Sequence, residues 1–209
     1  MSKATRHSHT LFERLRKPVS QVAAVIFLGV LVFSAPAAGC CRYSAILFET
    51  LGWLLVIAGV FGRLWCALYI GGHKNTHLRD DGPYSISRNP LYFFSFLGLL
   101  GLTLYMRMVM LTLIVAALFV IYYYFVIRSE ENRLKEIFGA TFQNYLNKVP
   151  RFWPNFSLYS TRKSFEIEPA EVLKAVKDVV WFFLAIIFLG ILKHLQAMGV
   201  VPSYFVWPW

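Results

Sequence analysis

The chain has 209 residues, of which 57% are hydrophobic and only 15% are charged, and its mean hydropathy is +0.54. About a quarter of the residues in a soluble domain are charged, so this composition excludes an ordinary soluble domain and predicts an all-α integral membrane protein. The formal net charge of +10 does not indicate nucleic-acid binding, because the basic residues gather at the ends of apolar runs and form no face interleaved with aromatic side chains.

Apolar runs predict about five transmembrane helices, at residues 19–39, 47–72, 91–106, 109–127 and 178–195. A basic arm, residues 1–18, precedes the first run. An alternative for this region is a cleaved signal peptide, because the apolar core 22–33 is followed by small residues as far as Cys40. The arm is long for the start of a signal peptide, so an uncleaved first helix is favoured.

The second run contains Arg63 well inside its apolar stretch. A cation at that depth is costly unless it reaches the headgroups or finds a partner. The sequence leaves both interpretations open, an arginine that extends to the inner membrane surface and one with a functional role.

The third and fourth runs are separated by a tight reversal near residues 105–108, which predicts an antiparallel helical hairpin. Gly98 and Gly101 in the third run permit the close approach of another helix. The fourth helix is predicted to continue past the lipid boundary as an amphipathic segment that ends at Gly139. Residues 140–165 are expected to form an interfacial lid or re-entrant segment, residues 166–177 a polar helix, and residues 204–209 an aromatic belt at the far interface.

Lysine and arginine residues predict the orientation of the chain. Residues 1–18, 73–90 and 128–177 hold 17 of the 21 Lys and Arg residues, so these segments are expected in the cytosol. A bacterial inner membrane is favoured over the endoplasmic reticulum. The three cysteines, Cys40, Cys41 and Cys66, have neither the spacing of a disulfide framework nor that of a metal site, so no metal is predicted.

The stretch Gly82–Tyr92 is a polar hinge that leads into the third helix. Gly82-Pro83 is typical of a turn, Asn89 is a favourable N-cap residue, and Pro90 suits the first position of a helix. The acidic pair Glu130-Glu131 comes about forty residues later, where the fourth helix leaves the membrane. We predict that the hinge and the acidic pair meet in one pocket at the same membrane face.

A ligand for such a pocket would carry its own carboxylate for the helix N-terminus and a cation or hydroxyls for the acidic residues. S-adenosylmethionine meets both demands. The alternative for the acidic pair is a solvated helix face on which Glu131 and Lys135 form an i,i+4 pair.

Four sequence features carry a family resemblance: GPYSISRNPLY at the hinge, EENRLKEIFG after the hairpin, Tyr145, and KVPR at residues 148–151. In this order and spacing, over about residues 50–155, the chain resembles the isoprenylcysteine carboxyl methyltransferase family and its phospholipid methyltransferase relatives. The resemblance implies three regions: residues 1–46 with the arm and first helix, a methyltransferase core at 47–156, and a C-terminal region at 157–209.

The resemblance further implies a membrane enzyme that uses S-adenosylmethionine and methylates a lipophilic acceptor or lipid substrate. It implies cofactor contacts from Thr76, His77, Leu78, Arg79, Tyr84, Asn89, Pro90, Leu91, Tyr92 and Glu130. Glu131 and Arg128 are the candidate catalytic residues, expected to orient the acceptor.

The chain departs from the family pattern at three places. Asn89 replaces the hinge histidine, Val126 stands where the isoprenylcysteine enzymes carry an arginine, and a further helix follows residue 156. Asparagine does not titrate, so Asn89 cannot transfer a proton. Two alternatives remain: a sterol-type membrane reductase, for which the chain lacks a dinucleotide fingerprint, and a non-catalytic membrane protein that keeps the fold.

Overall fold

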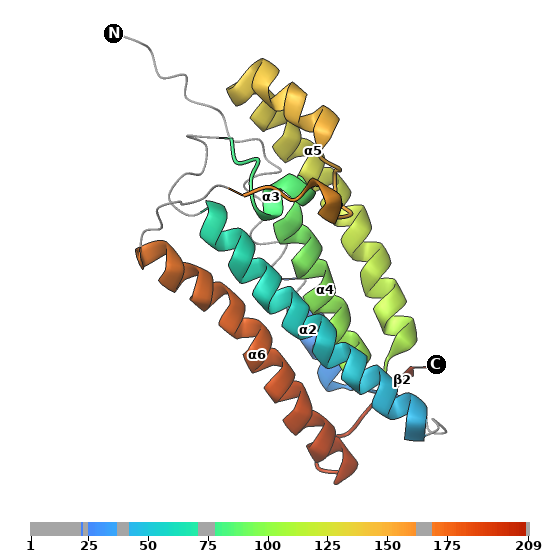
Figure 1. Cartoon of the computed structure of the whole chain (residues 1–209). Coiled ribbons are helices and arrows are strands. Elements are labelled where there is room, and N and C mark those ends of the chain that lie inside the picture. Colours follow the sequence, from blue (N-terminus) through green and yellow to red (C-terminus); the bar gives the residue numbers. More distant parts are fainter. Residues whose placement is uncertain (1–21, 23–24, 37–41, 71–77, 162–168, 208–209) are drawn as a thin grey trace.

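The computed structural model describes residues 22, 25–36, 42–70, 78–161 and 169–207. Its main body is a bundle of four helices, α2 (Arg42–Ile70), α4 (Pro90–Tyr105), α5 (Val109–Lys148) and α6 (Pro169–Ala197). α4 packs between α2 and α5, and α6 lies on the other side of α2 (Figure 1). The short helices α3 (Pro83–Ile86) and η1 (Phe156–Leu158) lie at one end of the bundle, and the strands β1 (Ser34–Pro36) and β2 (Phe205–Trp207) lie at the other.

Three of these helices are long and apolar enough to cross a membrane, over Tyr43–Ile70, Val109–Lys148 and Ala170–Ala197. α4 is a shorter apolar helix that packs closely on α2. These features confirm the predicted class, an all-α integral membrane protein.

The predicted first helix differs from the structure at its C-terminal end. Residues 25–32 are helical, but the chain turns at Phe33 and residues 34–36 form β1, which pairs in parallel with β2. Pro36 explains the early end, because a proline disfavours helical geometry at the residue before it and lacks a backbone donor. Residues 19–21 and 37–39 of the prediction lie outside the described ranges. Residues 205–207 of the aromatic tail form the strand β2, and Trp207 in this strand donates from Nε1 to Ser34 Oγ of β1 at 2.8 Å.

Glycine residues allow α2 and α4 to approach closely, as predicted for Gly98 and Gly101. A Cβ placed on Gly59 would lie 2.8 Å from the Cα of Gly98, and one placed on Gly101 would lie 2.7 Å from the backbone oxygen of Gly52. Both distances are shorter than side-chain contacts permit. The prediction of close approach is confirmed, and the partner helix is α2.

The predicted hairpin of α4 and α5 is confirmed, with a three-residue connection in which Arg107 adopts a φ of 60°. α5 bends at Gly139, whose φ of 52° and ψ of −125° interrupt the helix where its end was predicted. Beyond the bend, residues 140–148 form another helical segment, whereas the prediction of an interfacial lid or re-entrant segment at 140–165 specified no helix there. The hydrophobic face of Phe142, Tyr145 and Val149 explains the difference, because it buries against the rest of the protein.

α6 is one continuous helix, although the sequence suggested a polar helix and a separate apolar span. Its buried residues include Val179, Ile186 and Leu189, which join the main apolar core with residues of α2 and α4. At the strand end, Lys193 of α6 donates to Glu49 of α2 at 2.6 Å, and Arg107 lies 3.6 Å from the same carboxylate. This ionic cluster joins α2, the hairpin turn and α6.

Candidate functional site

The hinge is held in place by the segment 149–161, which crosses it at the α3 end of the bundle. Backbone hydrogen bonds join Arg88 N to the oxygen of Pro150 at 2.9 Å, Asn155 N to the oxygen of Ile86 at 2.8 Å, and Gly82 N to the oxygen of Ser160 at 2.7 Å. These bonds satisfy polar backbone groups that would otherwise be buried without partners. Because they span most of the hinge, they set its path before α4 begins.

Asn89 occupies the N-cap position of α4, as predicted, but its side chain does not cap the helix. Its Nδ2 donates instead to the backbone oxygen of Arg151 at 2.9 Å. The backbone oxygen of Asn89 accepts from the amides of Tyr92 and Phe93. The prediction of a side-chain cap is therefore wrong, because a tertiary contact with the 149–161 segment takes up the amide.

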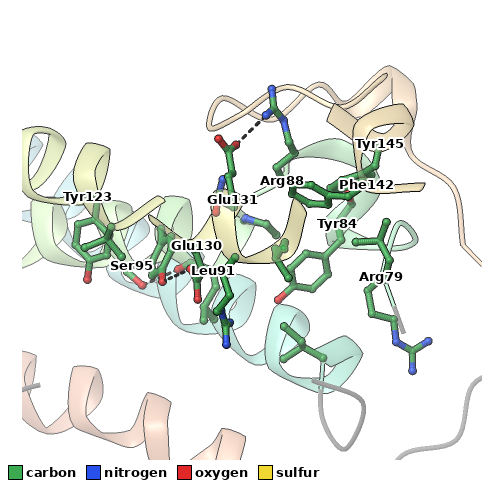
Figure 2. Close-up of a pocket in the computed structure, with 18 of the residues that line it drawn as sticks. Arg79, Tyr84, Arg88, Leu91, Ser95, Tyr123, Glu130, Glu131, Phe142 and Tyr145 are labelled. Carbon is green, nitrogen blue, oxygen red and sulfur yellow. Dashed lines mark hydrogen bonds and ion pairs between the residues drawn. The ribbon is translucent and has the colours of Figure 1, made fainter. Parts of the chain in front are cut away.

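The hinge and the acidic pair meet, as predicted. The phenol of Tyr92 donates to Glu130 Oε2 at 2.7 Å. Glu131 accepts from Arg88 Nη1 at 2.8 Å and from Arg151 Nη2 at 2.5 Å. Figure 2 shows the Arg88 guanidinium facing the Glu131 carboxylate. The two adjacent acids therefore have different roles in the fold, since Glu131 is neutralised by two arginines and Glu130 faces a phenol.

A cavity of about 380 Å³ opens between these residues, within the range of 300–1,000 Å³ common for small-molecule sites. Most of the predicted site residues line it: Leu78, Arg79, Tyr84, Asn89, Pro90, Leu91, Tyr92, Glu130 and Glu131. Arg128 does not. It is exposed, and its Nη1 donates to the phenol of Tyr124 at 3.4 Å. Thr76 and His77 lie outside the described residues.

Further lining residues are ones that the sequence analysis did not assign to this pocket. They include Arg63 of α2, Ser95 of α4, Tyr122, Tyr123 and Arg133 of α5, and Phe142 and Tyr145 beyond the bend. Tyr123 and Glu130 are seven residues apart, a helical spacing that could have indicated a shared face. Phe142 and Tyr145 could not be found in this way, because the bend at Gly139 redirects them.

The walls of the cavity are predominantly basic, with four arginines (Arg63, Arg79, Arg88 and Arg133) against two glutamates. Arg88 is paired with Glu131, and the hydrogen bond to Glu131 raises the pKa of the Arg151 guanidinium. Burial, and next the nearby Cys66, raises the pKa of the Tyr84 phenol well above its usual value, so Tyr84 stays a neutral donor. Such a site can bind an anionic group on its arginines and a cation or hydroxyls at Glu130.

The described residues contain no group of three or more His, Cys, Asp or Glu side chains that could hold a metal ion. Within those ranges, the polar groups of the cavity are carboxylates, guanidiniums, phenols, an amide and a hydroxyl.

Fold and site together define an integral membrane protein with a polar cavity where α4 begins and α5 leaves the apolar bundle. Residues 47–141 match the model of the phospholipid methyltransferase family. The chain is 35% identical over 159 residues to the nickel-cobalt-cadmium resistance protein NccN of Alcaligenes xylosoxydans xylosoxydans, a match that covers 76% of this chain and 74% of that protein. The chain belongs to the phospholipid methyltransferase family.

The cobalt-zinc-cadmium resistance protein CzcN of Cupriavidus metallidurans is 40% identical over 136 residues, which cover 65% of this chain and 62% of that protein. No solved structure matches the chain.

Proposed function

We propose that the protein is a membrane methyltransferase that uses S-adenosylmethionine to methylate a lipophilic acceptor. The observation that carries the proposal is the meeting of Tyr92 and Glu130 in a basic cavity at the polar end of an apolar bundle. Membership of the phospholipid methyltransferase family supports it.

The donor set of the cavity fits this cofactor. Glu130 offers a carboxylate for the ammonium or ribose hydroxyls, and Arg79 offers a guanidinium for the carboxylate of the methionine part. Arg79 has a buried Nε with no hydrogen-bond partner among the described residues, and such a group gains a partner when an anion binds. Tyr84 and Leu91 supply flat and apolar walls.

When bound, S-adenosylmethionine would supply a methyl group carried on a sulfonium. The chain's own residues would then hold the reactants in line and exclude water. The 149–161 segment would hold the hinge in position beside the site through its backbone bonds, and Glu131 attaches this segment to α5 through Arg151. The donor would enter from the cytosol and the acceptor from the membrane. The distribution of basic residues supports this orientation, and we propose a bacterial inner membrane as its setting.

Calorimetry with S-adenosylhomocysteine tests the proposal on protein purified in a nonionic detergent. We expect binding by the natural chain and a loss of affinity of about tenfold or more in Glu130→Gln, because a charge-assisted hydrogen bond is removed. Glu136→Gln is the matched control, since Glu136 lies on the same helix but is exposed. No binding by the natural chain, or equal binding by Glu130→Gln, would contradict the proposed site. NADPH in the same titration tests the reductase alternative.

The names of the two relatives suggest the setting in which the activity serves. Both are named as resistance proteins for cobalt and cadmium, with nickel or zinc as a third metal. We propose that methylation of a membrane component by this chain supports metal resistance. A strain lacking the gene should regain growth on cadmium with the natural chain and with Glu136→Gln, but not with Glu130→Gln. Equal rescue by the natural chain and by both variants would show that resistance does not depend on methyl transfer.

A further inference from the structure

The cavity extends from its polar mouth into the apolar part of the bundle. α2 lines it with Ile70, its last residue, and with Arg63, while α5 lines it with Glu130 and Tyr123. Each pair is seven residues apart, which corresponds to about 10 Å along a helix. Figure 2 shows Ser95 and Tyr123 at one end of the pocket and Arg79 and Phe142 at the other. The site therefore has a deep end within the membrane-spanning segments.

Arg63 lies at this deep end and points into the bundle. Its Nη1 donates to Ser95 Oγ of α4, and its guanidinium carbon lies 5.6 Å from the centroid of the Phe182 ring of α6. An arginine that extends to the headgroups would point along α2 toward its end at Ile70. The contacts with α4 and α6 argue against the first of the two interpretations that the sequence left open, an arginine that extends to the membrane surface.

The charge of Arg63 is not neutralised within the described part of the chain. None of the carboxylates described there forms an ion pair with it. Its Nε is buried and lacks a hydrogen-bond partner in the same residues. Ser95 is a neutral partner that also donates to the oxygen of Leu91 at 2.6 Å. A cation at this depth is costly without a counter-ion, so an anion entering the cavity would be strongly favoured there.

We infer that Arg63 binds an anionic group, a carboxylate or a phosphate, on the lipophilic acceptor. This inference rests on the proposed function, because it takes the mouth of the cavity for the methyl donor and the deep end for the acceptor. The apolar chain of the acceptor would lie among the helices, and Phe182 would support the flat face of the guanidinium. Phe182 lies beyond the family match at 47–141, so this contact comes from outside the matched region.

Native mass spectrometry of the purified full chain tests the inference with four probes: dodecanoate, dodecyl phosphate, uncharged dodecanol and inorganic phosphate. We expect the natural chain to bind at least one of the two lipophilic anions about tenfold more tightly than dodecanol. Arg63→Gln should lose this preference and Arg63→Lys should keep part of it, since lysine retains the charge but not the planar group that lies over Phe182. Lys135→Gln is the control, because it removes an exposed cation from the same face of the membrane. Whichever lipophilic anion binds more tightly identifies the group as carboxylate or phosphate.

S-adenosylhomocysteine affinity, measured on the same variants, separates this inference from the proposed function. Unchanged affinity in Arg63→Gln together with lost anion preference supports the acceptor site. Lost S-adenosylhomocysteine affinity in a folded Arg63→Gln protein overturns the inference, because Arg63 then serves the donor. Equal binding of anions and dodecanol overturns it, and so does inorganic phosphate that binds as tightly as dodecyl phosphate. If anions bind through Arg63 but the natural chain does not bind S-adenosylhomocysteine, the anion site stands and the methyltransferase proposal fails.

Discussion

Glu131 is the residue through which the 149–161 segment is attached to α5. Its carboxylate is largely buried, with 10% of the side chain exposed, and it lies between Arg88 of the hinge and Arg151 of the segment. Glu130, its neighbour in sequence, also lines the cavity, and its carboxylate accepts from Tyr92 rather than from an arginine. Adjacent residues on a helix point about 100° apart, so one acid can hold the fold while the other remains available to a ligand.

We predict that Glu131→Gln lowers the free energy of unfolding by about 2 kcal/mol, less than for a fully buried pair because Arg151 is 39% exposed. The loss arises because two guanidiniums then face each other without a carboxylate. Arg151→Gln should cost less, since Arg88 still pairs with Glu131. Thermal unfolding in detergent measures both, and Glu171→Gln in an exposed pair with Lys174 is the control. A larger loss in Arg151→Gln would contradict this account.

Tyr84 is expected to make stability depend on pH. Burial raises the pKa of its phenol above the usual 10.0, so above about pH 10 the unfolded chain loses this proton while the folded chain keeps it. The contribution of the Tyr84 phenol to the free energy of unfolding is therefore present below about pH 10 and is lost as the pH rises beyond it. Tyr84→Phe should lose less stability than the natural chain between about pH 8 and pH 11. Unfolding midpoints of the natural chain and of Tyr84→Phe, measured at about pH 8 and about pH 11, check this prediction. Tyr43→Phe is the control, because Tyr43 is exposed, and it is expected to behave like the natural chain.

At the scale of the elements, the contact between α2 and α4 places the hinge over the cavity. α4 starts at the cavity and α2 lines it with Arg63 and Ile70, so a shift between the two helices would move both walls. The contact depends on backbone approaching backbone at Gly52, Gly59, Gly98 and Gly101. Such packing leaves no room for side chains.

Gly101→Ala is predicted to lower stability by about 1–3 kcal/mol, the usual cost of overpacking. The added Cβ would lie 2.7 Å from the backbone oxygen of Gly52, so α2 must move. The affinity for S-adenosylhomocysteine should also fall, because the movement of α2 shifts one wall of the cavity, although neither glycine lines the cavity itself. Thermal unfolding and calorimetry measure the two effects. Gly29→Ala is the control, because nothing lies within 4 Å of its added Cβ, and equal behaviour of the two variants would refute the packing argument.

At the scale of the whole molecule, the chain separates two polar ends by an apolar bundle. The hinge, the acidic pair and the 149–161 segment gather at one end, and the Glu49 cluster and the β1–β2 pair gather at the other (Figure 1). Described basic residues of the segments expected in the cytosol, among them Arg79, Arg133 and Arg151, lie at the first of these ends, so we expect the cavity to face the cytosol.

We predict that a membrane-impermeant thiol probe added to intact cells labels Arg42→Cys but not Asp80→Cys, in a chain whose three native cysteines have been replaced. Arg42 begins α2 at the strand end, and Asp80 is an exposed residue beside the cavity. After the cells are opened, both positions should be labelled, which controls for reactivity. Labelling of Asp80→Cys alone in intact cells would reverse the orientation.

Composition and local pattern were sufficient for the membrane class, the approximate positions of the helices α2, α4, α5 and α6, and the hairpin. These features depend on the solvent that each segment requires and on short-range turn chemistry. The tertiary structure alone decided that Glu131 is paired with Arg88 and Arg151, that Asn89 bonds the backbone of Arg151, and that Arg63 turns toward Ser95. The reason is physical: each choice depends on which partner packs against a helix face, and those partners lie 20 to 62 residues away in the chain.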